Sequence, residues 1–363
     1  YTLGGAIEIN GTNSAAIMGV NSNIENTSNI SSSASLNKGI VLKADDSNTY
    51  SLKNSSNISL LSDKSIGIYG TTQTGNINID NTGTINLGNT GSIADASVGI
   101  YGTAGVNITD NGTITGGTNT VGLYSNGGTL INNTGITLSH GSVGVYASGG
   151  TADINLGSSV TVGDNGAVAL YANNGAVLTN YSSNISAGTD SVIGYAKDSG
   201  TKLDNRAALS IQEEGVGFYT NNGYIVNSGT LSSAGNGIIY LYGNNGTIEN
   251  NGQINGSAHG YGVGIYGSNS DIKNTAAIVL GDSHIPHPND LSNKDNRFSV
   301  GIYGEGSKID NSSNITVGEN GIGIYSYAQS GDITNSGQIT STRDKAIGIF
   351  SEVGKNGKII NSG

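Results

Sequence analysis

The clearest pattern in this chain is a four-residue phrase of an apolar residue, glycine, a second apolar residue and tyrosine. Val121-Gly122-Leu123-Tyr124 is one copy, and Val143 to Tyr146 is the next. Most aromatic positions lie 22 to 25 residues apart, and two intervals are longer, at 32 and 37 residues. A period in the twenties is typical of a solenoid, in which each repeat buries its apolar side only by stacking on its neighbours. The aromatic positions are Tyr69, Tyr101, Tyr124, Tyr146, Tyr171, Tyr195, Tyr219, Tyr242, Tyr266, Tyr303, Tyr325 and Phe350.

A second phrase follows most of these tyrosines and places an asparagine between two apolar residues. Ile79-Asp80-Asn81-Thr82-Gly83-Thr84-Ile85 is one example, and Ile248 to Ile254 is another. Asparagine tolerates left-handed backbone geometry, and its amide can bond to an equivalent amide above and below it. We therefore expect an asparagine row at one bend of every turn, interrupted by Asp110 and broken at Leu156. Its members are Asn26, Asn54, Asn81, Asn132, Asn180, Asn205, Asn227, Asn250, Asn274, Asn311, Asn335 and Asn361.

Both phrases predict β-strands, because apolar residues alternate with period two and are bounded by Gly, Asn and Ser. The predicted fold is all-β: a single-stranded parallel β-helix of about 14 turns, roughly 22–25 residues per turn with two longer turns, continuous over residues 1–363. In the tyrosine phrase we expect Val121 and Leu123 to face inward, and Gly122 and Tyr124 to face outward. Three copies replace the glycine, which favours an outward position there: Ala169, Ile193 and Tyr240.

Composition narrows the class of protein. Charged residues make up 11% of the chain, the net charge is −11 and only 15 residues are basic, so a nucleic-acid-binding surface is not expected. The chain has no cysteine, which excludes disulfides and thiolate metal sites. The chain begins at Tyr1 and stops inside a repeat at Gly363. We expect it to be a piece of a longer protein.

The two longer turns predict excursions at residues 86–97 and 281–298, and insertions in a solenoid tend to lie on a binding face. The second excursion contains the chain's only two prolines and half of its histidines. Two interpretations stay open, a ligand-contacting loop and an insertion without a role. The candidate loop residues are His284, His287, Asp290, Arg297 and Phe298.

The aromatic row is a second candidate binding site. Outward tyrosines one turn apart could present a platform to sugar rings or aromatic partners. The alternative is structural, because aromatic pairs on one face of a sheet stabilise it by roughly 0.2–1 kcal/mol each. The candidate residues of the row are Tyr124, Tyr146, Tyr171, Tyr219, Tyr266 and Tyr303.

Catalytic, cofactor and metal sites find little support in the sequence. Glu213 and Glu214 are adjacent, so as strand residues they would point to opposite faces. Asp204 with Arg206, and the basic residues Lys273 and Lys308, look isolated. We expect no clustered acids on one sheet face, no metal site, no cofactor and no enzyme.

The phrases "VGIYG", "NxGxI" and "NSG" resemble the passenger repeats of fusobacterial type V autotransporter adhesins of the RadD-like outer-membrane family. The resemblance extends from about Ile17 to Gly363. It implies an extracellular β-helix on the bacterial surface, anchored by a C-terminal membrane barrel, that mediates attachment to host cells or coaggregation with other bacteria. It also implies recognition of host receptors or glycans, and it assigns no binding residue.

The sequence therefore predicts a non-catalytic, monomeric adhesin segment that presents loops and side-chain rows for weak multivalent contact. Two alternatives remain open: a polysaccharide-cleaving β-helix enzyme, and a structural spacer whose parent protein binds elsewhere.

Overall fold

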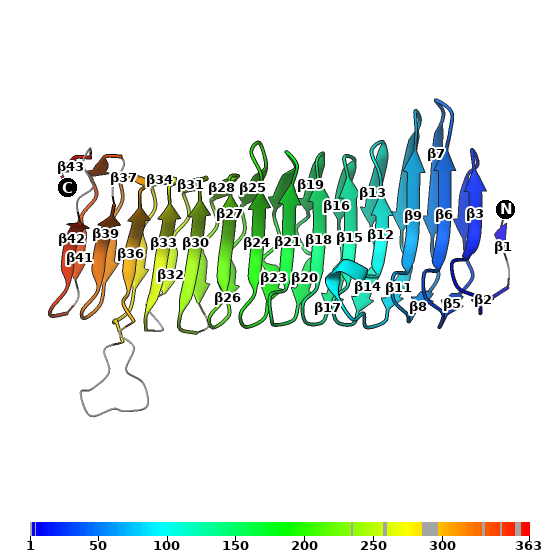
Figure 1. Cartoon of the computed structure of the whole chain (residues 1–363), viewed down its shortest axis with the longest axis horizontal. Helices are drawn as coiled ribbons and strands as arrows, with labels where there is room; N and C mark the ends of the chain where they lie inside the picture. Colours follow the sequence, from blue (N-terminus) through cyan, green and yellow to red (C-terminus); the bar gives the residue numbers. More distant parts are fainter. Residues whose placement is uncertain are drawn as a thin grey trace. The chain divides into compact units, whose positions relative to one another are not determined.

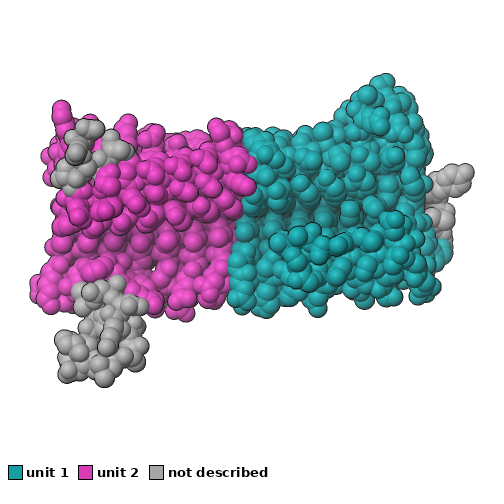
Figure 2. Space-filling view, in the orientation of Figure 1, with its two compact units in different colours: residues 1–187 teal, residues 188–363 magenta. Residues whose placement is uncertain are grey.

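A computed structural model describes residues 2–3, 5–233, 235–256, 260–284, 297–328, 331–341, 343–352 and 357–363. The chain forms a parallel β-solenoid of about 14 turns, as the repeat predicts. It divides into two compact units, residues 1–187 and 188–363, which Figure 2 distinguishes by colour. Among the described residues there is no α-helix. The expectation of one continuous body stays a prediction.

Each complete turn contains three strands in a fixed order, which Figure 1 shows as neighbouring arrows. The tyrosine phrase forms the first strand, the residues up to the row asparagine form the second, and a short apolar segment forms the third. We call the resulting sheets the tyrosine sheet, the asparagine sheet and the third sheet. One turn is β15 (Val121–Asn126), β16 (Thr129–Asn132) and β17 (Gly135–Leu138).

In unit 1 the three sheets contain the following strands. The tyrosine sheet comprises β3 (Ala15–Val20), β6 (Lys38–Ala44), β9 (Ile66–Thr72), β12 (Val98–Gly102), β15, β18 (Val143–Ser148) and β21 (Val168–Asn173). The asparagine sheet comprises β1 (Thr2–Leu3), β4 (Ile24–Asn26), β7 (Thr49–Asn54), β10 (Asn76–Asn81), β13 (Val106–Asp110), β16, β19 (Thr151–Ile154) and β22 (Val177–Asn180). The third sheet comprises β2 (Ile7–Ile9), β5 (Ile30–Ser32), β8 (Ile58–Leu60), β11 (Thr84–Leu87), β14 (Thr113–Gly116), β17, β20 (Ser159–Val162) and β23 (Asn184–Ala187).

Unit 2 repeats the same arrangement. The tyrosine sheet comprises β24 (Val192–Lys197), β27 (Val216–Asn221), β30 (Ile238–Asn244), β33 (Gly262–Ser268), β36 (Val300–Glu305), β39 (Ile322–Tyr327) and β42 (Ile347–Glu352). The asparagine sheet comprises β25 (Lys202–Asn205), β28 (Tyr224–Asn227), β31 (Thr247–Asn250), β34 (Asp271–Asn274), β37 (Lys308–Asn311), β40 (Ile333–Asn335) and β43 (Ile359–Asn361). The third sheet comprises β26 (Leu209–Ile211), β29 (Leu231–Ser233), β32 (Ile254–Gly256), β35 (Ile278–Leu280), β38 (Ile315–Val317) and β41 (Ile339–Ser341).

The paired strands of the three sheets are parallel, and each pair joins equivalent residues of successive turns. Tyr101 lies opposite Tyr124, and Asn227 lies opposite Asn250. Because successive turns carry the same residue type at the same place, identical side chains stack along each unit. This register is what makes the aromatic and asparagine rows possible.

The facing predicted for the tyrosine phrase is wrong at its first two positions. The glycine position is interior, since its replacements Ala169, Ile193 and Tyr240 are 0%, 1% and 2% exposed. The third position is also interior, as Leu123 shows, and the tyrosine is half-buried on the outer side as predicted. The first position lies outside beside the tyrosine, and in most copies it is half-buried. Two consecutive residues therefore point inward.

A bend at the glycine explains this departure from alternation. The pairing of β12 with β15 includes Ile100 and Leu123 but skips the glycines between the first and third positions. A Cβ on Gly122 would lie 2.6 Å from the carbonyl oxygen of Gly144 and 2.8 Å from Cγ2 of Ile136, so a side chain there needs extra room. Tyr240 has such room, because its hydroxyl occupies the space that a side chain at Gly256 would fill.

The asparagine row is confirmed as a buried ladder. In eight successive pairs the side-chain Nδ2 donates to Oδ1 of the next asparagine over 2.6–2.8 Å. The ladder asparagines are not in the left-handed conformation, which other residues of the turns adopt instead, so amide bonding alone explains them. Leu156 does not break the row, since it is 84% exposed; Ile154 lies between Asn132 and Asn180 and is fully buried.

The first excursion, residues 86–97, begins inside a strand. Its first two residues complete β11, and the chain then forms a single 3₁₀ turn, η1 (Ile93–Asp95). The side chain of Ser92 caps this turn by accepting a hydrogen bond from the backbone N–H of Ala94. Asp95 forms an ion pair of 2.9 Å with Lys64 at the surface.

Removing one ladder amide should destabilise the chain. Asn250→Ala deletes the bond from Asn227 and leaves Oδ1 of Asn274 buried without its donor. The expected loss in the free energy of unfolding is about 1–3 kcal/mol. Denaturant unfolding measures it, with Asn57→Ala, the same change at an exposed asparagine, as control, expected within about 0.5 kcal/mol of the parent chain. Equal effects of the two changes would contradict a stabilising ladder.

Candidate binding site

The outer side of the tyrosine sheet carries a continuous ladder of aromatic rings in each unit. Ring centroids of successive turns lie 4.5–5.3 Å apart from Tyr69 to Tyr171 in unit 1, and 4.7–5.2 Å apart from Tyr195 to Phe350 in unit 2. Most pairs are stacked or tilted, so the rings of these pairs cover each other's faces, whereas Tyr124–Tyr146 and Tyr242–Tyr266 meet edge to face. All six tyrosines predicted as a binding row lie in these ladders: Tyr124, Tyr146, Tyr171, Tyr219, Tyr266 and Tyr303.

This stacking limits what the ladder can bind. A sugar ring packs on an aromatic face, and here the faces inside the ladder are occupied by other rings. The exposed parts are ring edges and hydroxyls. Burial first, and then the charge of Glu305 and the neighbouring tyrosines, raises the pKa of Tyr266 to about 12. The hydroxyl therefore keeps its proton at neutral pH and donates to Oε2 of Glu305 over 3.3 Å.

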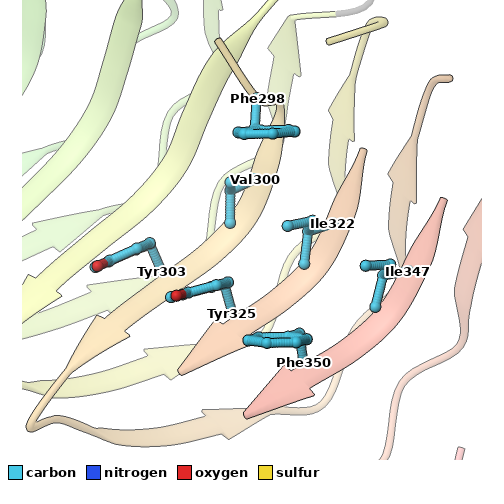
Figure 3. A pocket seen from close by; sticks show the side chains of 7 residues that line it. All are labelled: Phe298, Val300, Tyr303, Ile322, Tyr325, Ile347 and Phe350. Atoms are coloured by element: carbon cyan, nitrogen blue, oxygen red, sulfur yellow. The ribbon is translucent and has the colours of Figure 1, made fainter. Parts of the chain in front are cut away.

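An apolar groove runs beside the ladder at the last tyrosine strands of unit 2. Its volume is about 430 Å³, and Figure 3 shows an aliphatic row on one side and a ring row on the other. The bend at the glycine creates it, because the first and fourth positions of each phrase then share the outer side. The hydroxyls of Tyr303 and Tyr325 are the only polar side-chain groups of the lining. The lining residues are Phe298, Val300, Tyr303, Ile322, Tyr325, Ile347 and Phe350.

Three side chains of the groove are exposed; two of them, Ile347 and Phe350, lie on β42, which pairs with β39 on one side and, in the part of the chain that the structure describes, has no further tyrosine strand on the other. Phe298, Ile347 and Phe350 are 43%, 42% and 40% exposed. Val300 and Ile322 form its floor and are nearly buried. Of the predicted loop residues, Phe298 thus joins Tyr303 of the predicted aromatic row in one surface. We call this surface the outer groove.

The two ends of the second excursion are fixed to each other. His284 and Arg297 form an antiparallel bridge in which each backbone N–H donates to the carbonyl oxygen of the other, over 2.7 and 2.9 Å. The guanidinium of Arg297 donates to the Tyr261 hydroxyl over 2.7 Å and lies 5.3 Å from the centre of its ring. Glu214 lies 3.9 Å from the same guanidinium. The predicted residues His287 and Asp290 lie outside the described residues.

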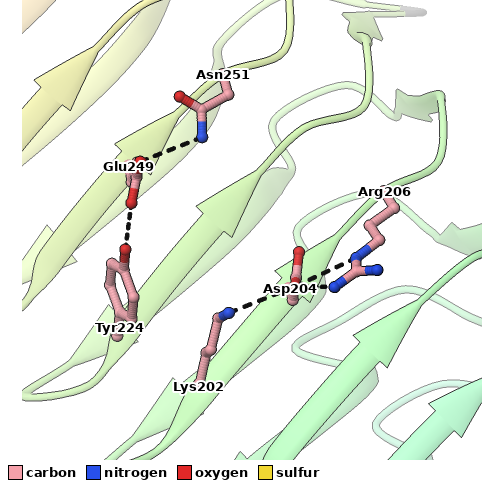
Figure 4. A network of polar contacts seen from close by, with 6 residues as sticks. All are labelled: Lys202, Asp204, Arg206, Tyr224, Glu249 and Asn251. Atoms are coloured by element: carbon pink, nitrogen blue, oxygen red, sulfur yellow. Dashed lines mark hydrogen bonds and ion pairs between the residues drawn. The ribbon is translucent and has the colours of Figure 1, made fainter.

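A polar network on the outer side of the asparagine sheet was not expected from the sequence. Figure 4 shows Lys202, Asp204 and Arg206 on and beside β25. Asp204 is nearly buried and accepts from the Arg206 Nη2 over 2.9 Å and from the Lys202 Nζ over 3.4 Å. Asp204 and Arg206, which looked isolated in the sequence, therefore form an ion pair that Lys202 joins. Alternate residues of a strand share a face, so this signal was present in the sequence.

The second half of the network joins three further turns. Tyr224 donates a hydrogen bond to Oε2 of Glu249, and Asn251 also donates to this carboxylate (Figure 4). Lys273, which looked isolated, lies 3.5 Å from Glu249. The hydrogen bond from Tyr224, with help from Lys273, lowers the pKa of Glu249. Burial and the contact with Glu249 raise the pKa of Tyr224 to about 12.

The two carboxylates of this network lie apart from each other and already have hydrogen-bond or ion-pair partners. Asp204 and Glu249 lie on strands separated by β28, so their backbones are about two strand spacings, or roughly 9.5 Å, apart. Both carboxylates already accept hydrogen bonds from cations, amides or the tyrosine, and Tyr224 retains its proton. Among the described residues, no group of three or more His, Asp or Glu side chains could hold a metal ion.

The fold and its outer surfaces define a passenger-type β-helix, a class in which a repetitive coil carries surface features on its outside. Residues 120–363 match the model of the BigA third pectate lyase-like domain, and the chain belongs to this family. This domain comes from surface-exposed adhesin proteins. Comparisons with curated proteins and with solved structures find no match. In the part of the chain that the structure describes, no helix has the length and apolar character needed to cross a membrane.

Tyr224→Phe should raise the pKa of Glu249 toward its ordinary value, because the change deletes the hydrogen bond that lowers it most. A carboxylate with a lowered pKa stabilises the folded chain above its unfolded value of 4.5, and this contribution is lost as the pH falls through the folded pKa. Carbon-detected NMR titration of the Glu249 carboxyl measures the shift. Tyr181→Phe is the control, and an unchanged Glu249 titration in Tyr224→Phe would contradict the network.

Proposed function

We propose that this chain is a non-catalytic segment of a bacterial surface autotransporter adhesin, and that it contacts host cells through a protein receptor. The outer groove carries this proposal. A solvent-facing depression lined almost wholly by carbon is a typical interaction surface, since isolated apolar side chains are ordinary but a contiguous patch is not. Membership in a family of adhesin domains and the repeat style of fusobacterial passengers support the same function.

A protein partner fits the outer groove better than a glycan does. Binding of a sugar needs hydrogen-bonding groups arranged around an open aromatic face. The groove offers two tyrosine hydroxyls, and neighbouring rings cover the faces of Tyr303 and Tyr325. Aliphatic or aromatic side chains of a protein would fill the space between Phe298 and Phe350 and release its water. The stacked turns hold the lining in place before contact, which lowers the entropic cost of binding.

Cleavage or binding of a polysaccharide is the second candidate, favoured by the polar network around Asp204 and Glu249. Lysine, arginine, tyrosine and carboxylate side chains are gathered there on one outer sheet face. Acidic glycans are the chemistry that Lys202 and Arg206 would recognise. A depolymerisation assay on uronate-containing glycans is the direct test, and released product would favour this candidate over a non-catalytic adhesin.

Charged substitutions in the outer groove should weaken cell binding. Phe298→Asp and Ile347→Asp place a carboxylate where apolar contact is expected, and both side chains are exposed enough to keep the fold. We expect at least about tenfold weaker binding to host epithelial cells by flow cytometry, because aromatic and aliphatic anchors dominate such interfaces. The control Leu61→Asp changes an exposed leucine outside the groove, and its binding should equal that of the parent chain.

The same assay separates the partner classes. Protease treatment of the cells should abolish binding, whereas glycosidase treatment should leave it. Binding that resists protease would contradict a protein receptor. Full binding by both groove variants would contradict the groove.

Deleting residues 285–296 tests the loop separately. His284 and Arg297 already form an antiparallel bridge, so Asn-Gly can join them as a two-residue turn. If the outer groove binds the receptor by itself, the shortened chain should keep its cell binding within about twofold, because Phe298 remains in place. Lost binding, with an unchanged thermal unfolding midpoint, would assign the contact to the excursion. Unchanged binding by this chain and by the groove variants together would assign the contact to another surface, whereas absence of binding by the parent chain would favour the spacer alternative.

A further inference from the structure

At one position of the asparagine ladder in unit 1, two buried side-chain oxygens have no hydrogen-bond donor. Asp110 takes the place of an asparagine between Asn81 and Asn132. Its Oδ1 accepts from Nδ2 of Asn81 over 2.8 Å and from the backbone N–H of Gly112 over 3.3 Å. Its Oδ2 is buried and has no hydrogen-bond partner, and neither has Oδ1 of Asn132. Asp110 and Asn132 are both fully buried.

The equivalent turns show what belongs at Oδ2. There, Nδ2 of the ladder asparagine donates both to the next Oδ1 and to the carbonyl oxygen two residues later. Nδ2 of Asn81 donates to the carbonyl oxygen of Gly83, and Nδ2 of Asn132 donates to the carbonyl oxygen of Thr134, each over 3.2 Å. The bond to Thr134 fixes the amide of Asn132, so its Oδ1 faces the preceding turn. Oδ2 of Asp110 therefore occupies the place of the Nδ2 donor of the other turns, and the side-chain atom of the next turn that faces it, Oδ1 of Asn132, is an acceptor.

A carboxylate cannot satisfy this position, because all of its oxygens accept. Two buried oxygens without hydrogen-bond partners cost free energy, whereas a proton on one of them makes a hydrogen bond. We propose that a proton resides on Oδ2 of Asp110 and bridges it to Oδ1 of Asn132, and that loss of this proton above neutral pH opens the ladder at this turn. In the folded chain the neutral, protonated form of Asp110 is then the normal state of this site. The proposal does not depend on the outer groove.

The electrostatic surroundings of Asp110 favour the neutral form. Burial is the main cause that raises the pKa of Asp110 from 3.8 to about 7, and the charge of Asp80 on β10 adds to it. The hydrogen bonds from Asn81 and Gly112 act in the opposite direction but are weaker. The neighbouring strands β14 and β16 carry no titratable side chain, and β9 and β12 carry only Tyr69 and Tyr101, which lie on the outer face.

The sign of the pH effect follows from these values. Between pH 3.8 and about 7 the folded chain holds a proton that the unfolded chain has released. Raising the pH across this window therefore favours opening, by up to about a thousandfold in the local equilibrium constant. The contribution is fully present below pH 3.8 and is lost as the pH rises through about 7.

Asp110→Asn tests the proposal, since it restores the donor that the other turns have. Infrared spectra of the parent chain below pH 6 should contain the carbonyl stretch of a protonated carboxyl, which disappears above pH 8 and is missing in Asp110→Asn. Hydrogen exchange at the amides of β13 and β16, corrected for intrinsic rates, should show protection that falls with pH in the parent chain and stays level in the variant. Asp153→Asn, the same charge change on the outer side of β19, should behave like the parent chain.

Two results would overturn the proposal. One is a parent spectrum without any protonated carboxyl assignable to Asp110 below pH 6. The other is lower protection of β13 and β16 in Asp110→Asn than in the parent chain at pH 8. A parent spectrum with no carboxyl band that disappears between pH 6 and pH 8 would overturn the proposal even if the variant folds poorly.

Discussion

The structure depends on one constraint: each residue lies directly above and below the same position of the neighbouring turns. A buried polar side chain can then be satisfied by its own repeat, which is why the interior tolerates asparagine. The amide has a donor and an acceptor, so a column of amides such as Asn205, Asn227 and Asn250 satisfies itself. No other neutral side chain of this size offers both groups in a fixed plane.

The same constraint explains which parts of the fold the sequence predicts. The strand order, the parallel register and the asparagine column follow from repeat spacing, and they are confirmed. The facing of the tyrosine phrase could not be read from alternation, because alternation assumes a straight strand. A bend at the glycine turns Gly122 and Leu123 inward together. That local geometry depends on the crowding between Gly122, Gly144 and Ile136, which is a property of three turns and not of one.

The candidate sites show the same division. Of the loop residues, His284 and Arg297 bridge the excursion, and Phe298 belongs to the outer groove, whose aliphatic side was assigned to the core by the alternation argument. The polar network was missed although its signal was available. Glu249 and Lys273 each directly precede a ladder asparagine, Asn250 and Asn274, so the predicted register already placed them side by side. Aligning the turns on their asparagines, rather than searching along the chain, would have found the pair.

Stacking also decides what the outer surface can recognise. Rings packed face to face stabilise their sheet, but they hide the surfaces that would bind sugars, so a longer ladder adds stability without adding binding faces. Recognition is left to places where the repeat departs from uniformity. At Phe298, the longer turn adds an aromatic ring beside Val300. At Asp110, an acid replaces the asparagine of the ladder. When all turns are equivalent, a substitution in one row of stacked side chains changes the chemistry of a single turn. A repetitive sequence acquires a defined site in this way.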